Sequence, residues 1–149
     1  MARFRGRPID EVVSTWTALA PRFEEAVAAF EVWPAVLDLA THEQDIRGAI
    51  DRPGGRDTEV VRLGSERLIA GMQAPVPLVV RVEDKEFQVG PGEAEDAPLL
   101  LETTRFEALR WRLGRRSRAQ LAALAWSRDP APVLDHLVIF GPSPEDIVE

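Results

Sequence analysis

The chain has 149 residues, and 45% of them are hydrophobic, which is enough for one globular domain or two small ones. Cysteine is absent, so disulfides, thiolate metal sites and cysteine nucleophiles are excluded. The formal charge of −7 disfavours sequence-independent binding to nucleic acid, and no apolar run is long enough to cross a membrane. The basic N-terminus is not followed by the apolar stretch of a secretory signal, so we expect a cytoplasmic protein.

The first predicted element is an amphipathic helix. Apolar residues recur at three- and four-residue steps from Ile9 to Phe30, a spacing that places them on one side of a helix of about twenty residues. Pro8 suits the first turn, where its missing amide costs nothing. Pro21 lies inside the pattern and predicts a kink or a break near Ala20.

Two more helices are predicted before residue 75. One begins near Trp33 and continues to about Ile50. Residues 52–57 form a cluster of glycine, proline and charged residues that separates the two, and Asp57 is the expected N-cap of the third helix. The apolar positions of that third helix include Val60, Leu63, Leu68 and Met72.

The pattern changes near residue 75 from helical spacing to short apolar runs. Strands are expected at residues 78–82, 87–89 and 99–103, and shorter helices at 104–113, 117–124 and 132–138. We therefore predict an α+β protein with two domains. Residues 1–74 are expected to be helical, and residues 75–149 to form a small α/β domain with a three-stranded antiparallel or mixed sheet.

Candidate ligands are densest in the second predicted helix. At about 100° per residue, Asp38, His42 and Asp45 project within roughly 40° of one line. A carboxylate and an imidazole one turn apart can hold a divalent metal if other elements supply further ligands. The same spacing also fits an ordinary pair on a helix surface.

Glu43 and Asp45 each have two interpretations. Glu43 falls within the apolar stripe of its helix, where an internal ion pair with Arg47 is favoured over a role as ligand or general base. Asp45 is expected either to accept a hydrogen bond from His42 and so fix its tautomer, or to be a surface acid.

Basic residues crowd the segment from Arg110 to Gln120, which contains a helix, a glycine and a second helix. A helix-turn-helix that reads DNA is one interpretation, but the acidity of the whole chain favours a solvated basic face. The four tryptophans are well separated and are expected to anchor a core or an interface. They are Trp16, Trp33, Trp111 and Trp126.

Five short segments together resemble one known family. The chain is similar to actinobacterial proteins of the mycothiol-dependent maleylpyruvate isomerase family, in which a DinB-like helical bundle precedes a small domain similar to sterol-carrier proteins. The similarity covers the chain from about Gly6 to its end. The segments are Thr41–Ala49 (THEQDIRGA), Arg52–Asp57 (RPGGRD), Gly114–Ser117 (GRRS), Asp129–Pro132 (DPAP) and Phe140–Pro142 (FGP).

The resemblance implies a divalent metal, typically zinc, held by two histidines and a carboxylate. Asp38 and His42 match the family's acidic-x-x-x-His pattern. It also implies mycothiol as cofactor and a small-molecule substrate, since a metal-bound thiol loses its proton near neutral pH and becomes a nucleophile for isomerisation or thiol transfer. The alternative is a non-enzymatic module that binds a ligand or a protein and has lost the complete metal site.

One part of the family pattern is not found in this chain. Family members usually begin with helices that carry the remaining histidine ligand, and the other histidine here, His136, is expected to form hydrogen bonds locally. Without those helices the apolar face left by the three predicted helices needs a cover, either from another subunit or from the C-terminal domain. We therefore expect either a homodimer or a partner that supplies the N-terminal helices.

Overall fold

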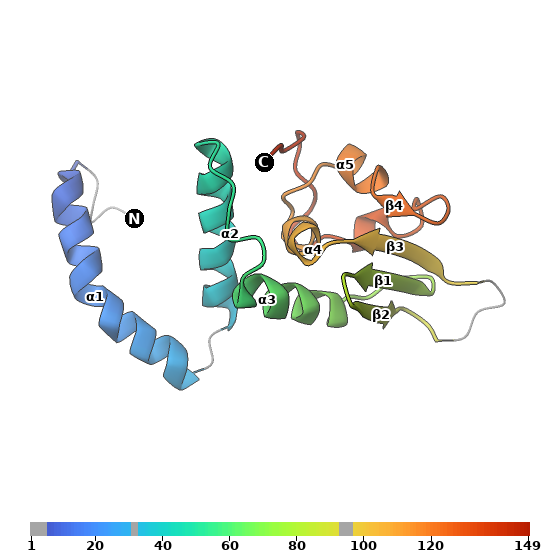
Figure 1. Cartoon of the computed structure of the whole chain (residues 1–149), viewed down its shortest axis with the longest axis horizontal. Helices are drawn as coiled ribbons and strands as arrows, with labels where there is room; N and C mark the ends of the chain where they lie inside the picture. Colours follow the sequence, from blue (N-terminus) through green and yellow to red (C-terminus); the bar gives the residue numbers. More distant parts are fainter. Residues whose placement is uncertain (1–5, 31–32, 93–96) are drawn as a thin grey trace. The chain divides into compact units, whose positions relative to one another are not determined.

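The computed structural model describes residues 6–30, 33–92 and 97–149, which form an α+β fold in which three helices precede a small mixed sheet (Figure 1). This confirms the predicted class. By its internal contacts the chain divides into two compact units, residues 1–38 (unit 1) and 39–149 (unit 2). None of the described helices is both long enough and apolar enough to span a bilayer. The helices are α1 (Ile9–Phe30), α2 (Trp33–Ala49), α3 (Glu59–Ala70), α4 (Arg105–Arg112) and α5 (Arg118–Ala122).

Unit 1 contains α1 and the first residues of α2. Asp10 and Glu11 lie in the first turn of α1, where carboxylates interact favourably with the positive end of the helix dipole. The helix continues through Pro21 and bends along its length (Figure 1). Of the two outcomes predicted for this proline, the chain therefore bends and does not break.

The sheet lies in unit 2 and has the strand order β2-β1-β3-β4. The hairpin partners β1 and β2 are antiparallel, β1 and β3 are parallel, and β3 and β4 are antiparallel, so the sheet is mixed. The predicted three strands are present, and a two-residue fourth strand is added. The strands are β1 (Leu78–Val82), β2 (Lys85–Val89), β3 (Leu99–Thr103) and β4 (Ala125–Trp126).

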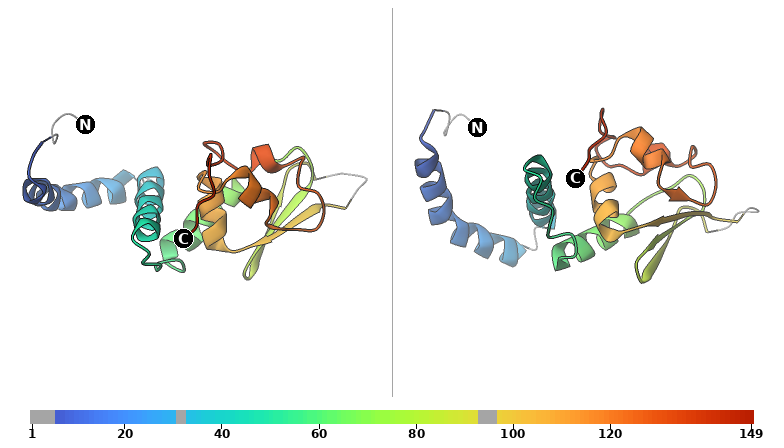
Figure 2. Two further views of the ribbon diagram at one scale, coloured as in Figure 1. Left: turned by 90° about the horizontal axis from the view of Figure 1, so that it is seen from above. Right: turned by 45° about the horizontal axis from the view of Figure 1, so that its top comes forward.

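One face of the sheet carries the core. Residues 78, 80 and 82 of β1 are buried, and residues 99 and 101 of β3 lie beside them in register. Trp111 of α4 and Leu121 of α5 pack on this apolar face, and Figure 2 shows both helices on one side of the sheet. The core therefore joins the sheet to α4 and α5.

Helix α3 packs against α4 and belongs to the same core. The boundary expected at residue 75 therefore lies inside unit 2, at the point where helix gives way to strand. The N-cap of α3 is Thr58, whose hydroxyl accepts a hydrogen bond from the Val61 amide, so the prediction of Asp57 was wrong by one residue. The threonine hydroxyl satisfies an amide that has no partner within the helix.

The C-terminal helices are shorter than predicted. Thr104 and Ser117, the first residues of two predicted helices, are the N-caps of α4 and α5, and the Ser117 cap is a full capping box. The helix predicted for residues 132–138 was wrong, since only the 3₁₀ turn η2 (Leu134–His136) forms there. The amide of Ile139 donates a hydrogen bond to the carbonyl of Arg112 on α4. The chain after η2 is therefore bonded to α4 and does not continue as a helix.

Candidate functional site

The four candidate residues from the sequence all lie on α2. Asp38 is one turn before His42, and Glu43 and Asp45 follow on the part of the helix that belongs to unit 2. The Nδ1 atom of His42 lies 3.3 Å from Oδ2 of Asp45, and 58% of the histidine side chain is exposed. This contact is the one expected of an acid that orients the imidazole ring.

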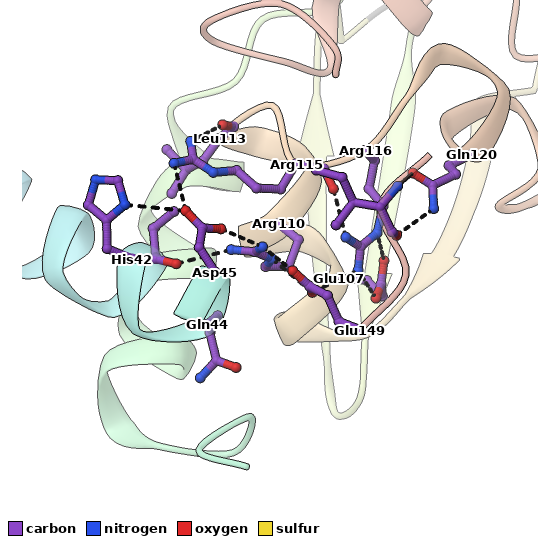
Figure 3. Close-up of polar contacts among 12 residues, drawn as sticks. His42, Gln44, Asp45, Glu107, Arg110, Leu113, Arg115, Arg116, Gln120 and Glu149 are labelled. Atoms are coloured by element: carbon purple, nitrogen blue, oxygen red, sulfur yellow. Dashed lines mark hydrogen bonds and ion pairs between the residues drawn. The ribbon is translucent and has the colours of Figure 1, made fainter. Parts of the chain in front are cut away.

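Asp45 also forms ion pairs with two arginines, one on α4 and one in the loop that follows α4, as Figure 3 shows. Arg110 Nη2 lies 2.7 Å from Oδ1, and Arg115 Nη2 lies 3.2 Å from Oδ2. Burial alone would raise the pKa of Asp45, but the hydrogen bonds from Arg110 and Arg115 outweigh it and lower the pKa below its ordinary value. Asp45 is therefore an ionised acceptor at neutral pH and not a proton donor.

Arg110 is the centre of this group. Its side chain is only 1% exposed, and its guanidinium donates to Asp45, to the carbonyl of Thr41 at 3.2 Å and to the carboxylate of Glu149. A buried guanidinium needs partners of this kind for its charge and its N–H groups. We call Asp45, Arg110, Arg115 and Glu149 the Asp45 cluster, and it links α2, α4 and the C-terminal segment within unit 2.

The predicted ligands Asp38 and His42 do not form a complete metal site with other side chains of the described residues. Within the described ranges, no group of three or more histidine, aspartate or glutamate side chains could hold a metal ion. Asp38 and His42 supply two donors from one helix, whereas a zinc site needs three or four. The nearest further carboxylate, Asp45, is bound by two guanidinium groups, whose positive charge opposes a divalent cation.

The remaining candidates, Glu43 and His136, both have exposed side chains. Glu43 pairs with Arg47, with Arg47 Nε 2.9 Å from Oε1, so the predicted ion pair forms. It lies on the surface and not inside, because the apolar neighbours Leu39, Ile46 and Ile50 are themselves exposed. The side chain of His136 is exposed at the 3₁₀ turn η2.

The arginine-rich segment is not a solvated basic face, so that prediction was wrong. Arg110, Arg112 and Arg116 are buried. Arg112 donates to the carbonyls of Leu68 and Leu137, and Arg116 forms a two-pronged pair with Glu107. These side chains connect backbone segments inside unit 2 and leave little positive charge on the surface.

At least three clefts in the described part of unit 2 are large enough for a small molecule, and two of them are lined by charged side chains. The first, of about 700 Å³, lies beside the Asp45 cluster and is lined by Arg115, Ser143, Asp146 and other C-terminal residues. The second, of about 540 Å³, lies near the N-termini of α3 and α4 and is lined by Arg56 and Phe106 among others. In both clefts acidic and basic side chains occur together, so neither has a charge that selects one ligand class.

Among the described residues, one face of α1 exposes a row of large apolar side chains. Ile9, Val13, Trp16, Leu19 and Phe23 are each at least half exposed, with Trp16 at 67% and Ile9 at 71%. Exposed apolar groups of this size in a single stripe usually mark an interaction surface. The spacing of apolar residues predicted an apolar face on this helix, and the resemblance to the family implied that the apolar face of the helical bundle needs a cover. Neither pattern marked the face of α1 as the candidate site.

Comparisons of the chain with protein families, with curated proteins and with solved structures returned no match.

Proposed function

We propose that this protein is a non-enzymatic binding module whose binding surface is the apolar face of α1. The observation that carries the proposal is the row of large apolar side chains along that helix, each at least half exposed. A helix with such a face binds by laying it against another apolar surface, which removes the side chains from water. The α+β fold of unit 2 supplies the stable body to which this helix is attached.

The polar centre of unit 2 supports the same proposal. Arg110 and Asp45 are engaged by other protein groups, and Asp45 keeps its charge, so Asp45 has no proton to donate to a substrate at neutral pH. A catalytic centre of the predicted kind requires a group whose protonation or coordination is left available for substrate. The Asp45 cluster instead acts as an internal brace between α2, α4 and the C-terminal segment.

Photo-crosslinking tests the proposed binding surface. A benzophenone amino acid is placed in the full chain at Trp16, on the apolar face, or at Glu25, on the opposite face of α1. We expect the probe at position 16 to crosslink to the partner bound on the apolar face, and the probe at position 25 to give little or no adduct. The adduct at position 16 should be lost when Phe23→Glu is added. Equal adducts from both positions, or an adduct at position 16 that survives Phe23→Glu, would contradict the proposal.

The metal-dependent, mycothiol-linked isomerase or thiol transferase of the maleylpyruvate isomerase family is the second candidate. Its support is the sequence resemblance together with the largely exposed imidazole of His42 one turn after Asp38. It requires at least one metal ligand from outside the described residues. Metal analysis of protein purified without a histidine tag tests it: about one equivalent of zinc that is lost in His42→Ala would support it, and no bound zinc after zinc is supplied would reject it.

A further inference from the structure

We propose that the partner of α1 is α1 of a second copy of this chain, packed antiparallel across a two-fold axis. This inference rests on the proposed function, because it names the occupant of the same apolar face. A two-fold pairing requires a face that is complementary to itself. The following observations on α1 indicate such a face.

The apolar positions of α1 follow a heptad repeat. From Ile9 to Val27 they are separated alternately by four and three residues, which gives three positions of each core type, a and d. Pro21 falls at an outer position of the repeat and is exposed, so its ring does not obstruct the face. A 4-3 repeat keeps the apolar stripe in line along a helical partner, which a repeat of 3.6 does not. The d positions are Ile9, Trp16 and Phe23, and the a positions are Val13, Ala20 and Val27.

Side-chain size alternates between the two core positions. The d positions carry large residues, with rings at Trp16 and Phe23, whereas the a positions carry alanine or valine. In an antiparallel pair an a position of one helix faces a d position of the other, so each large side chain meets a small one. A parallel pair would place Trp16 against Trp16 and Ala20 against Ala20. The Trp16 layer would then be overpacked, and the Ala20 layer would contain a cavity.

The residues flanking the stripe support the same orientation. The g flank is apolar, with Val12, Leu19 and Ala26, and the e flank is polar, with Asp10, Thr17 and Glu24. In an antiparallel pair g faces g and e faces e, so the apolar flanks bury one another and the polar flanks share solvent. A parallel pair would set Glu24 against Leu19.

The available apolar area is sufficient for association. Trp16 and Phe23 are 67% and 51% exposed, so their burial in both copies removes up to about 350–600 Å² from water, since a fully buried aromatic side chain covers roughly 150–250 Å². The aliphatic positions bring the total near the lower size range of specific interfaces, about 1,200 Å². We therefore expect a reversible dimer with a moderate dissociation constant.

Sedimentation of the full chain over a wide range of concentrations tests the inference. Wild-type protein is expected to convert from monomer to dimer, and Trp16→Glu is expected to raise the dissociation constant at least about 30-fold, as for a central interface residue. The matched control is Ala18→Glu, which adds the same charge on the exposed outer face of α1 and should leave the dissociation constant unchanged. Both substitutions replace exposed side chains, so folding of unit 2 should be unaffected.

Hydrogen exchange of the α1 amides separates this inference from the proposed function. A dimer that Trp16→Glu dissociates, and whose α1 amides lose protection on dissociation, supports both. A monomer at every concentration with rapidly exchanging α1 amides overturns self-pairing and leaves the binding face for another partner. A monomer with protected α1 amides means that another part of the same chain covers the face, and this overturns both. A dimer that Trp16→Glu does not affect also overturns the inference.

Discussion

At the scale of single residues, buried arginines account for much of how unit 2 is held together. Arg110 and Arg112 lie on α4 with their guanidinium groups inside the protein, where they donate to carboxylates and to backbone carbonyls. Burial of such a group without partners costs several kcal/mol, so each acceptor that is present matters. Removal of one acceptor should therefore destabilise the fold more than removal of a surface acid.

Asp45→Asn tests this at neutral pH. The amide keeps the shape of the side chain but removes the negative charge between Arg110 and Arg115, while Glu149 remains near Arg110. We expect the free energy of unfolding to fall by roughly 1–3 kcal/mol at pH 7. The matched control is Glu43→Gln, which breaks the exposed pair with Arg47 and should change stability by less than about 0.5 kcal/mol.

The same variant gives a pH dependence of known sign. The pKa of Asp45 is lower in the folded protein than its unfolded value of about 3.9. The contribution of Asp45 to the free energy of unfolding is therefore complete above the unfolded pKa and is lost as the pH falls through the folded pKa. Denaturant unfolding of wild type and Asp45→Asn should therefore differ most near neutral pH and converge in acid. A difference that grows on acidification would contradict the assignment.

The sequence did not predict this role for the arginines. Arg110 and Arg112 lie on α4 and Arg116 follows in the loop after it, a spacing that a solvated basic face would also give. Their burial depends on the carbonyls of Leu68 and Leu137 and on the carboxylate of Glu107, which come from three separate parts of the chain. Local pattern contains no information about such long-range acceptors.

At the scale of secondary-structure elements, the end of α4 is fixed by a glycine. Gly114 follows the helix with φ of +78°, a left-handed conformation that residues with a Cβ atom rarely adopt. A Cβ atom there would lie 2.5 Å from the carbonyl oxygen of Gly141. The turn therefore allows the C-terminal segment to approach α4 closely.

Gly114→Ala should accordingly destabilise the protein by about 2 kcal/mol or more, since backbone strain and displacement of the Gly141 carbonyl add together. Gly92→Ala is the control, because a Cβ atom there meets no atom within 4 Å, and it should be nearly neutral. Thermal unfolding of both variants measures the difference. Equal melting temperatures for the two would show that the approach to Gly141 is not required.

Most elements were predicted because their signals are local. The strand at residues 78–82 follows from a short apolar run, and the helices that begin near Thr104 and Ser117 follow from hydroxyl side chains before helical runs. The strand β4 was not predicted, because two residues have no periodicity and pair only through Leu101 and Glu102 of β3. Element type was thus predictable, whereas tertiary pairing was not.

At the scale of the whole molecule, the two units differ in how they satisfy their apolar residues. Unit 2 buries its core among α3, α4 and the sheet. Unit 1 has α1, whose apolar face is exposed in the described structure. We therefore predict that α1 determines how the protein assembles and that unit 2 folds independently of α1.

Distances between spin labels on α1 test this central claim most directly. The chain has no cysteine, so single cysteines can be placed for labelling at the outer positions Glu11, Ala18 and Glu25. With 1.5 Å of rise per residue, an antiparallel pair gives a label distance that changes along α1, longer at residue 11 than at the more central residue 18 by about 10 Å. Equal distances at the three positions would show a parallel pair, and the absence of any interlabel distance would contradict pairing through α1.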